Sequence, residues 1–294
     1  MSFSDVRLIV ERKYEILSKI GEGTFGKIFK GVNINNKSVV AIKIEKSSES
    51  KLLFNEAKIY KNLEGMLGIP RILSFGKEGI FNYLVIDLLD ESLEEIRNVC
   101  GGTLSLKCVL NIGLQLLMRI EMFHNAGLIH RDIKPDNFLI DRKTNIIYII
   151  DFGLAKQYLD VSGNHIPPDK CRKLTGTARY VSTNVHSGIS PSRRDDIESI
   201  GYLLIYLLTG SLPWQKIKHS DKTKKYEMIG DEKIARSLFE HFPNVPSEFI
   251  TFLLYCRNMK FDEDPDYDYL KNIFIALYKH HGYETDNNYD WNIV

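Results

Sequence analysis

The sequence predicts an α+β fold of two unequal parts, a small β-rich lobe with one main helix and a larger α-helical lobe. Short strand-like runs separated by turn residues fill the first third of the chain, and longer apolar periods typical of helices fill the rest. The joining segment, residues 88–92, is not a Pro-, Gly- or Ser-rich linker. We therefore expect two closely hinged lobes that share a cleft.

Four runs with strand character and turn residues between them predict the sheet of the first lobe, at residues 14–20, 27–32, 39–44 and 83–88. One helix, roughly residues 51–63, interrupts them. In the second lobe, apolar residues from Leu106 to Phe123 recur with helical spacing, and Gly127 ends that helix. Residues 195–208 are apolar nearly all round, which predicts a helix enclosed by other helices.

Bulk composition excludes several classes of protein. Of the 294 residues, 39 are Lys or Arg and 38 are Asp or Glu, so no global field attracts nucleic acid or an anionic membrane. The four cysteines form no zinc or disulfide pattern, which favours a reducing compartment, cytoplasmic or nuclear. The longest uncharged run, residues 199–215, is shorter than the ~20 residues that span a bilayer. We expect it to be a buried helix plus a turn, and we expect no membrane anchor.

A glycine-rich stretch, Ile20–Ile28, lies between the first two predicted strands. Glycines without side chains let backbone N–H groups approach phosphate oxygens closely, although three glycines in six residues also make an ordinary hairpin. A dinucleotide-binding motif would be followed by a helix, whereas here a strand follows. The pattern therefore favours a phosphate-covering flap.

Lys43 and Glu56 form a predicted ion pair. Period-2 alternation places Lys43 on the same strand face as Val39 and Ala41, where an edge lysine reaching water is the alternative interpretation. Glu56 falls within the apolar stripe of the following helix. Since an unpaired buried charge would cost several kcal/mol, Lys43 is the expected partner.

The octet from His130 to Asn137 follows the Gly127 helix stop and combines a base, two cations and a metal-ligating amide. In this interpretation Asp132 orients a substrate hydroxyl and accepts its proton. Lys134 offsets charge on a transferring phosphoryl group, and Asn137 helps to hold Mg²⁺. For His130, packing is expected rather than proton transfer.

Asp151 emerges at the end of a buried strand, followed by Phe152 and Gly153. A carboxylate there can bridge Mg²⁺ to phosphates, and a capping or turn role is the alternative. Its position nineteen residues after Asp132 favours the metal role.

The ordered set Gly-x-Gly-x-x-Gly, Ala-Ile-Lys, Glu56, His-Arg-Asp and Asp-Phe-Gly resembles the eukaryotic protein kinases over nearly the whole chain. Further stretches resemble the casein kinase 1 family: residues 174–180, Ser-Thr-Asn at 182–184 in place of Ala-Pro-Glu, and residues 192–196, 210–215 and 265–267. The resemblance implies the bilobal kinase fold, with an N-terminal extension at 1–13, a kinase domain at 14–285 and a short end at 286–294. Within that domain it implies an N-lobe at 14–88, a hinge at 87–92 and a C-lobe at 93–285.

The resemblance also implies a Ser/Thr protein kinase that uses ATP and Mg²⁺. The catalytic residues would be Lys43, Glu56, Asp132 and Lys134, and the Mg²⁺ ligands would be Asn137 and Asp151. Ala41 would pack on the adenine, and Ile86 would be the gatekeeper. The hinge backbone at Asp87 and Leu89 would hydrogen-bond the adenine. The implied ATP-binding residues are Ile20, Gly21, Glu22, Gly23, Thr24, Phe25, Gly26, Lys27, Ile28, Ala41, Lys43, Ile86, Asp87 and Leu89.

Family members favour a serine or threonine that follows an acidic or phosphorylated residue, and Arg179 and Lys225 match the family's anion site. The alternative to an anion-binding role is a solvated loop that contains Lys218, Lys222, Lys224 and Lys225. The chain departs from the family at Asp90-Glu91, where Gly-Pro is usual, and at Lys216, where glycine is usual. We expect constitutive activity, a monomer, protein substrates, and no lipid anchor or regulatory tail.

Three other functions fit the sequence less well. An ATP-binding pseudokinase scaffold usually lacks one of the catalytic residues, which are all present here. A small-molecule kinase would not need the substrate segment at 175–180. Nucleic-acid binding or nuclear import through residues 218–225 is weakened by the neighbouring acidic residues, and no specific nucleic acid is expected.

Overall fold

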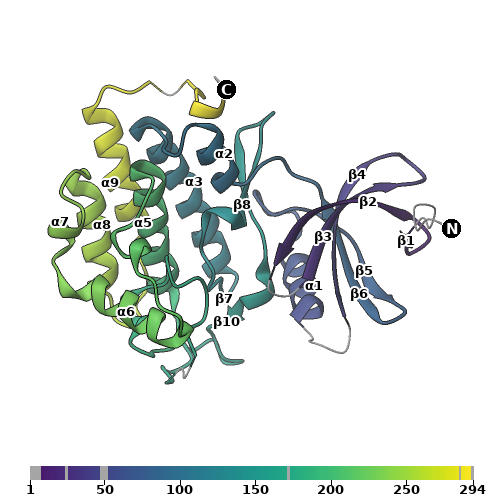
Figure 1. Cartoon of the computed structure of the whole chain (residues 1–294), viewed down its shortest axis with the longest axis horizontal. Coiled ribbons are helices and arrows are strands. Elements are labelled where there is room, and N and C mark those ends of the chain that lie inside the picture. The colour runs from purple at the N-terminus through teal and green to yellow at the C-terminus, as the bar shows by residue number, and fades with distance from the viewer. Residues whose placement is uncertain (1–7, 24–25, 47–51, 171–172, 285, 293–294) are drawn as a thin grey trace. The chain divides into compact units, whose positions relative to one another are not determined.

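The computed structural model describes residues 8–23, 26–46, 52–170, 173–284 and 286–292. Two compact units divide the chain. The first comprises the residues up to Asp90 together with Tyr148–Gly153, and the second comprises Glu91–Ile147 and the residues from Leu154 onward. The first unit is β-rich and the second is helical, so the predicted α+β fold with a β-rich N-lobe and a helical C-lobe is confirmed (Figure 1).

An antiparallel sheet of six strands forms most of the first unit, in the order β1-β2-β3-β4-β6-β5. Its strands are β1 (Ile9–Val10), β2 (Tyr14–Gly23), β3 (Gly26–Asn33), β4 (Val39–Lys46), β5 (Ile72–Glu78) and β6 (Phe81–Asp87). All four predicted strands are present. Edge strands β1 and β5 were not predicted, because β1 is two residues long and β5 lies largely at the surface with no clear alternation.

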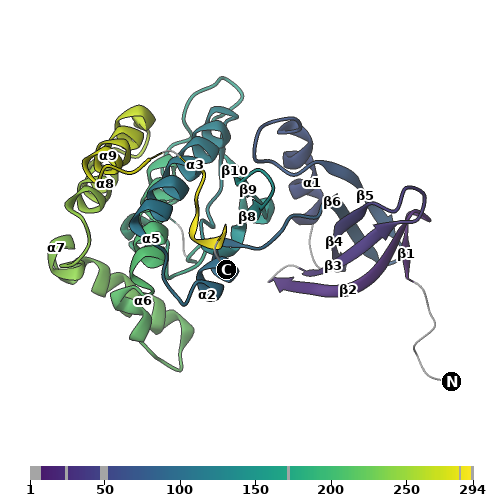
Figure 2. The same cartoon turned by 90° about the horizontal axis from the view of Figure 1, so that it is seen from above.

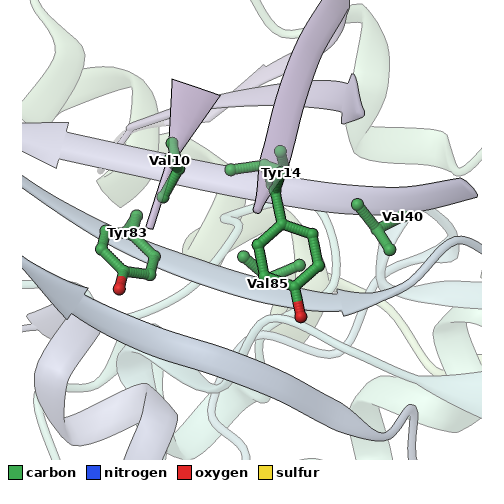
Figure 3. Close-up of a cluster of buried hydrophobic side chains, with 6 residues drawn as sticks. Val10, Tyr14, Val40, Tyr83 and Val85 are labelled. Atoms are coloured by element: carbon green, nitrogen blue, oxygen red, sulfur yellow. The ribbon is translucent and has the colours of Figure 1, made fainter. Parts of the chain in front are cut away.

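Apolar side chains from four strands pack on one face of this sheet. Figure 3 shows Val10, Tyr14, Val40, Tyr83 and Val85 converging there. Ile42 is buried with them, so the face of β4 that carries Val40 and Ile42 belongs to this core. This packing leaves Lys43 on the other face of β4.

Helix α1 (Leu52–Asn62), the one large helix among the described residues of the first unit, contacts β5 and β6. Lys51, the first residue of the predicted helix, lies outside the described residues. Leu53, Ala57 and Tyr60 are buried on its apolar stripe, and Glu56 is buried among them, as the sequence indicated.

The second unit is built from eight helices in its described part. They are α2 (Leu93–Val99), α3 (Leu106–Asn125), α4 (Thr183–His186), α5 (Arg193–Thr209), α6 (Lys222–Ala235), α7 (Leu238–His241), α8 (Ser247–Asn258) and α9 (Tyr267–His280). Helix α5 packs against α3 and α8, and α9 packs against the same two helices (Figures 1 and 2). Nearly every residue of α5 is buried, which confirms the predicted enclosed helix.

Glycines end the two long helices of the second unit. Gly127 follows α3 with a φ of 77°, and Gly210 follows α5 with a φ of 78°. Both angles lie in the left-handed region that glycine adopts without steric cost. A short turn at Pro213–Lys216 comes next, so the uncharged run at 199–215 is a buried helix plus a turn, as predicted.

Four short strands complete the structure. β7 (Leu128–Ile129) pairs with β10 (Lys156–Gln157), and β8 (Phe138–Asp141) pairs with β9 (Ile146–Ile149). These strands flank the two segments that carry the His130 octet and Asp151. No described helix is both long and apolar enough to cross a membrane.

The alternative interpretation of residues 218–225, a solvated loop, does not hold for the second half of this stretch. Helix α6 begins at Lys222, and the side chain of Asp221 caps it by accepting hydrogen bonds from the backbone N–H groups of Thr223 and Lys224. An aspartate at the N-cap satisfies donors that have no partner within the helix.

The last described residues pack onto the second unit. Trp291 is buried, its ring stacks on Tyr289, and its indole N–H donates to Asn145 Oδ1 at 3.0 Å. The Asp290 carboxylate accepts hydrogen bonds from the backbone N–H and the hydroxyl of Ser105, just before α3. Residues 289–291 therefore form part of the packed unit.

Candidate active site

Lys43 lies between two carboxylates in the first unit. Its ammonium nitrogen is 2.7 Å from Glu56 Oε2 and 2.7 Å from Asp151 Oδ1. The Glu56 side chain is only 3% exposed, and that of Lys43 is 14% exposed. The structure thus brings together three sequence-predicted residues from β4, α1 and the segment after β9, and it confirms the pairing of Lys43 with Glu56.

The charge state of this group follows from its surroundings. Burial acts to lower the pKa of Lys43, but the carboxylates of Glu56 and Asp151 outweigh burial and hold that pKa above its ordinary value. Lys43 is therefore a permanent cation at neutral pH. Asp151 is the more open of its two partners, with a side chain 31% exposed.

Asp151 has an unusual backbone conformation, with a φ of 63° in a residue other than glycine. Its N–H donates to the hydroxyl of Tyr60 at 3.3 Å, and the Tyr60 ring packs against Phe152 with centroids 4.4 Å apart. Sequence reasoning missed Tyr60, because its place in the apolar stripe of α1 indicates burial and says nothing of its hydroxyl. The Tyr60 side chain thus helps to hold the Asp151 carboxylate toward Lys43.

The glycine-rich stretch forms the turn end of the β2–β3 pair. Gly21 lies opposite Ile28 and Gly23 lies opposite Gly26, while Thr24 and Phe25 lie outside the described residues. A Cβ on Gly26 would come within 2.5 Å of the carbonyl oxygen of Ile44 on β4, so only glycine fits there. A strand, β3, follows the glycines, which agrees with the flap interpretation, because a dinucleotide site would have a helix in that place.

The residues expected around an adenine lie on β4 and β6. Ala41 lies directly opposite Ile86 in the strand register, on the strand face that also carries Lys43. Asp87 ends β6, and its carboxylate accepts two hydrogen bonds from the Arg71 guanidinium, at 2.9 Å each. The side chain of Asp87 thus has a structural partner, and Leu89 follows two residues later in the chain.

In the second unit, three side chains surround the Asp132 carboxylate. Lys134 donates to Oδ2 at 2.8 Å, and the Thr177 hydroxyl donates to Oδ1 at 2.7 Å. The amide of Asn137 donates to the backbone carbonyl of Asp132 at 2.8 Å and to the carboxylate Oδ2 at 3.4 Å. Asp132, Lys134 and Asn137 are therefore together as predicted, and Thr177 is a member that had not been singled out.

Buried Asp196 on α5 holds the backbone of this loop. Its carboxylate accepts hydrogen bonds from the N–H groups of His130, at 2.7 Å, and Arg131, at 2.8 Å. His124 lies 3.0 Å from the same carboxylate and lowers the pKa of Asp196 against the opposing effect of burial. His130 is fully buried and packs against Phe123, which agrees with the expected packing role.

Arg179 and Lys225, the candidate anion site, belong to the segment before α4 and to α6. The Arg179 guanidinium is near the rings of Tyr180 and Tyr206, at 5.6 and 5.3 Å from their centroids. Lys225 lies in the first turn of α6. Among the described contacts none joins the two side chains, so their cooperation stays a prediction.

Glu91, one of the departures from the family pattern, has a structural partner. Arg142 donates to both oxygens of the Glu91 carboxylate, at 2.8 and 3.0 Å, and lowers the pKa of Glu91. Arg142 also donates to the carbonyl of Trp291 at 3.3 Å. The charge expected at Glu91 is therefore neutralised by Arg142. Lys216 ends the short turn whose Trp214 donates its indole N–H to the carbonyl of Arg179.

The residues expected to hold magnesium fit that ion by their chemistry. Among the described residues, no three His, Cys, Asp or Glu side chains gather as a metal site. Asn137 and Asp151 supply an amide and a carboxylate, and Mg²⁺ commonly takes one or two carboxylates and completes its shell with water and substrate phosphates. An ion held this way depends on a bound nucleotide for much of its coordination.

The two units therefore carry different chemical groups. The first unit supplies a fixed cation beside a partly open carboxylate, which suits the binding of phosphate oxygens and a metal ion. The second unit supplies a carboxylate with an adjacent cation, which suits the orientation and deprotonation of a hydroxyl. A family model described as the protein kinase domain matches residues 14–266. By that match over most of its length, the chain belongs to the protein kinase domain family.

Proposed function

We propose that this chain is a Ser/Thr protein kinase of the casein kinase 1 type, which transfers the γ-phosphate of MgATP to serine or threonine in protein substrates. The observation that carries the proposal is the Asp132 carboxylate, held by Lys134 on one oxygen and by Thr177 on the other. A lysine two residues after the aspartate follows the Ser/Thr-kinase pattern. The kinase domain would cover residues 14–285, after an extension at 1–13 and before a short end at 286–294.

Asp132 acts on the substrate hydroxyl in this mechanism. Its carboxylate orients the serine oxygen and accepts the hydroxyl proton as that oxygen bonds to the γ-phosphorus and the bond to the leaving ADP oxygen breaks. Lys134 offsets negative charge on the phosphoryl group. Bound MgATP supplies the phosphoryl group and the metal that neutralises it.

Lys43, Glu56 and Asp151 bind the nucleotide. Lys43 would donate to phosphate oxygens, and Glu56 keeps the Lys43 ammonium in place. Asp151 and Asn137 would each supply an oxygen ligand to Mg²⁺. The glycine-rich stretch Ile20–Ile28 covers the phosphates. Ala41 packs on the adenine, Ile86 is the gatekeeper, and the backbone of Asp87 and Leu89 hydrogen-bonds the base.

The substrate preference is for acidic or phosphorylated residues before the acceptor. Arg179 and Lys225 supply the two cations, and charge-assisted hydrogen bonds to phosphate are the strongest that a protein surface offers. The enzyme would act as a constitutively active monomer in the cytoplasm, the nucleus or both.

One kinetic experiment tests the whole proposal. Purified enzyme with MgATP is given a serine peptide with or without phosphoserine three residues upstream, and Asp132→Asn is compared with the unaltered chain. We expect preferential turnover of the primed peptide and a loss of at least about 100-fold in the variant, the lower range for general-base catalysis. An unaffected Asp132→Asn variant would contradict the assigned base. Nucleotide binding without transfer to casein or to either peptide would favour the pseudokinase alternative.

Charge-removal variants test the anion site separately. Arg179→Gln and Lys225→Gln should raise the KM of the primed peptide and leave that of the unprimed peptide almost unchanged. Lys279→Gln removes the same charge from an exposed position in the last turn of α9 and serves as the matched control. Equal turnover of the two peptides by the unaltered enzyme would count against the site.

A further inference from the structure

Helix α6 carries a completely buried lysine. The side chain of Lys233 has no exposed surface, and its ammonium donates to the carbonyls of Ala178, at 3.1 Å, and Val181, at 2.5 Å. The same ammonium lies 4.9 Å from the ring centroids of both Tyr202 and Trp214. Its direct acceptors are thus two neutral backbone carbonyls, with two aromatic faces beside them.

Burying an ammonium in this way is costly. Taking such an ion out of water costs several kcal/mol, which only good hydrogen bonds offset. Burial lowers the pKa of Lys233 well below its ordinary value, although the carboxylate of Glu198 acts in the opposite direction. An apolar side chain would fill this position at a lower cost in free energy. The role of Lys233 is therefore to donate hydrogen bonds to the two carbonyls.

Other side chains hold the same stretch of backbone. His186 Nε2 lies 3.1 Å from the carbonyl oxygen of Ala178, and Trp214 donates its indole N–H to the carbonyl of Arg179 at 2.8 Å. Three of the four carbonyls in residues 178–181 therefore accept hydrogen bonds from side chains on α4, α6 and the Pro213–Lys216 turn. We call these three side chains, His186, Trp214 and Lys233, the carbonyl clamp.

The clamped backbone lies between two groups of the proposed kinase site. Thr177, immediately before it, donates to the Asp132 carboxylate. Arg179, within it, has a side chain directed to the rings of Tyr180 and Tyr206. Any shift of this backbone would move the Arg179 guanidinium away from its present place.

We propose that Lys233 is a positioning residue for protein-substrate recognition, whose buried ammonium fixes the backbone of residues 178–181 and thereby orients Arg179 toward the acidic or phosphorylated part of the substrate. This inference rests on the proposed kinase function. It extends the anion site beyond its two surface cations to a lysine that no substrate can touch.

The central variant is Lys233→Met, which keeps the length of the side chain and removes the ammonium. Hydrogen bonds of charged groups are stronger than those between neutral groups, so a partial loss of orientation should raise the KM of the primed peptide about tenfold. The KM of ATP should stay within twofold of the unaltered value. Lys224→Met, at an exposed position on the same helix, should change neither KM.

A double-variant cycle links the effect to Arg179. In the Arg179→Gln background, Lys233→Met should cause no further loss of preference for the primed peptide, because the group that it positions is gone. Full additivity of the two losses, or an unchanged preference in Lys233→Met alone, would overturn the proposal.

Hydrogen exchange supplies a readout that needs no kinase activity. The amides of Tyr180 and Val181, which donate to the carbonyl of Thr177, should exchange at least tenfold faster in Lys233→Met than in Lys224→Met. Should Lys233→Met not fold, Trp214→Phe tests the clamp, since it keeps a ring and removes the donor to Arg179. Unchanged exchange at both amides in the folded variant would refute the clamp. Faster exchange in a protein that phosphorylates no peptide would retain the clamp and reject the kinase function.

Discussion

The hydroxyl of Thr177 provides a direct test of how the Asp132 carboxylate is held. Thr177→Val replaces the hydroxyl with a methyl group of nearly the same size and removes the 2.7 Å hydrogen bond to Oδ1. Lys134 remains on the other oxygen, so the carboxylate loses one of its two side-chain donors at close distance. A hydrogen bond to a charged group contributes about 1.5–3 kcal/mol, which converts to a loss of roughly 10- to 100-fold in kcat/KM for the peptide.

Steady-state kinetics with a serine peptide measure this loss. Thr177→Ser keeps the donor and should retain activity within a few-fold, which separates the hydrogen bond from the shape of the side chain. The KM of ATP should change little in either variant, because Thr177 contacts the proposed base and not the nucleotide-binding residues of the first unit. Activity of Thr177→Val within twofold of the unaltered enzyme would refute the role assigned to this contact.

Three further changes test other parts of the structure. Glu56→Gln removes one of the two carboxylates that hold Lys43, and kcat/KM for ATP should fall about 10- to 100-fold in coupled assays while far-UV circular dichroism stays unchanged. Burial, with the nearby Lys233 cation, lowers the pKa of His186 to about 4. The unfolded chain, with a histidine pKa of about 6.5, therefore takes up this proton first. The contribution of His186 to the free energy of unfolding is fully present above about pH 6.5 and is lost as pH falls toward 4. Urea titrations should show that the free energy of unfolding falls less over that pH range in His186→Gln than in the unaltered protein. The same fall with pH in both proteins would contradict the lowered pKa of His186. Trp291→Ala should cost about 3–5 kcal/mol and lower Tm by roughly 10 °C in calorimetry, whereas a change below 1 °C would show that the end of the chain packs too loosely to stabilise the second unit.

Much of the local structure follows from sequence patterns alone. The alternation along β4 identifies Val40 and Ile42 as core residues, and the helical periods of α3 and α5 give their extent to within a few residues. These patterns are informative because the elements are either half-buried or fully enclosed. Strand β5 was missed since it lies at the sheet edge, where little burial constrains its residues. Helix α6 was missed because its first turn is lysine-rich, and the N-cap Asp221 was not recognised.

The sequence by itself determined which chemical groups this protein has. Glu56 lies in the apolar stripe of its helix, and a buried carboxylate there is stable only beside a cation, which the sequence offers in Lys43. The order of the short motifs was enough to indicate a kinase, because each motif requires particular residue types at fixed spacing.

Only the tertiary structure decided which side chains hold those groups in place. Tyr60 on the backbone of Asp151, Thr177 on Asp132, Arg142 on Glu91 and Lys233 on the carbonyls of 178–181 are separated from their partners by 45 to 91 residues of chain. No periodicity reports such contacts, since a local pattern records whether a residue is buried and not which polar group it meets there. The physical reason is that hydrogen bonds are directional and short, so partners distant in sequence are fixed only when the packed elements bring their atoms within about 3 Å.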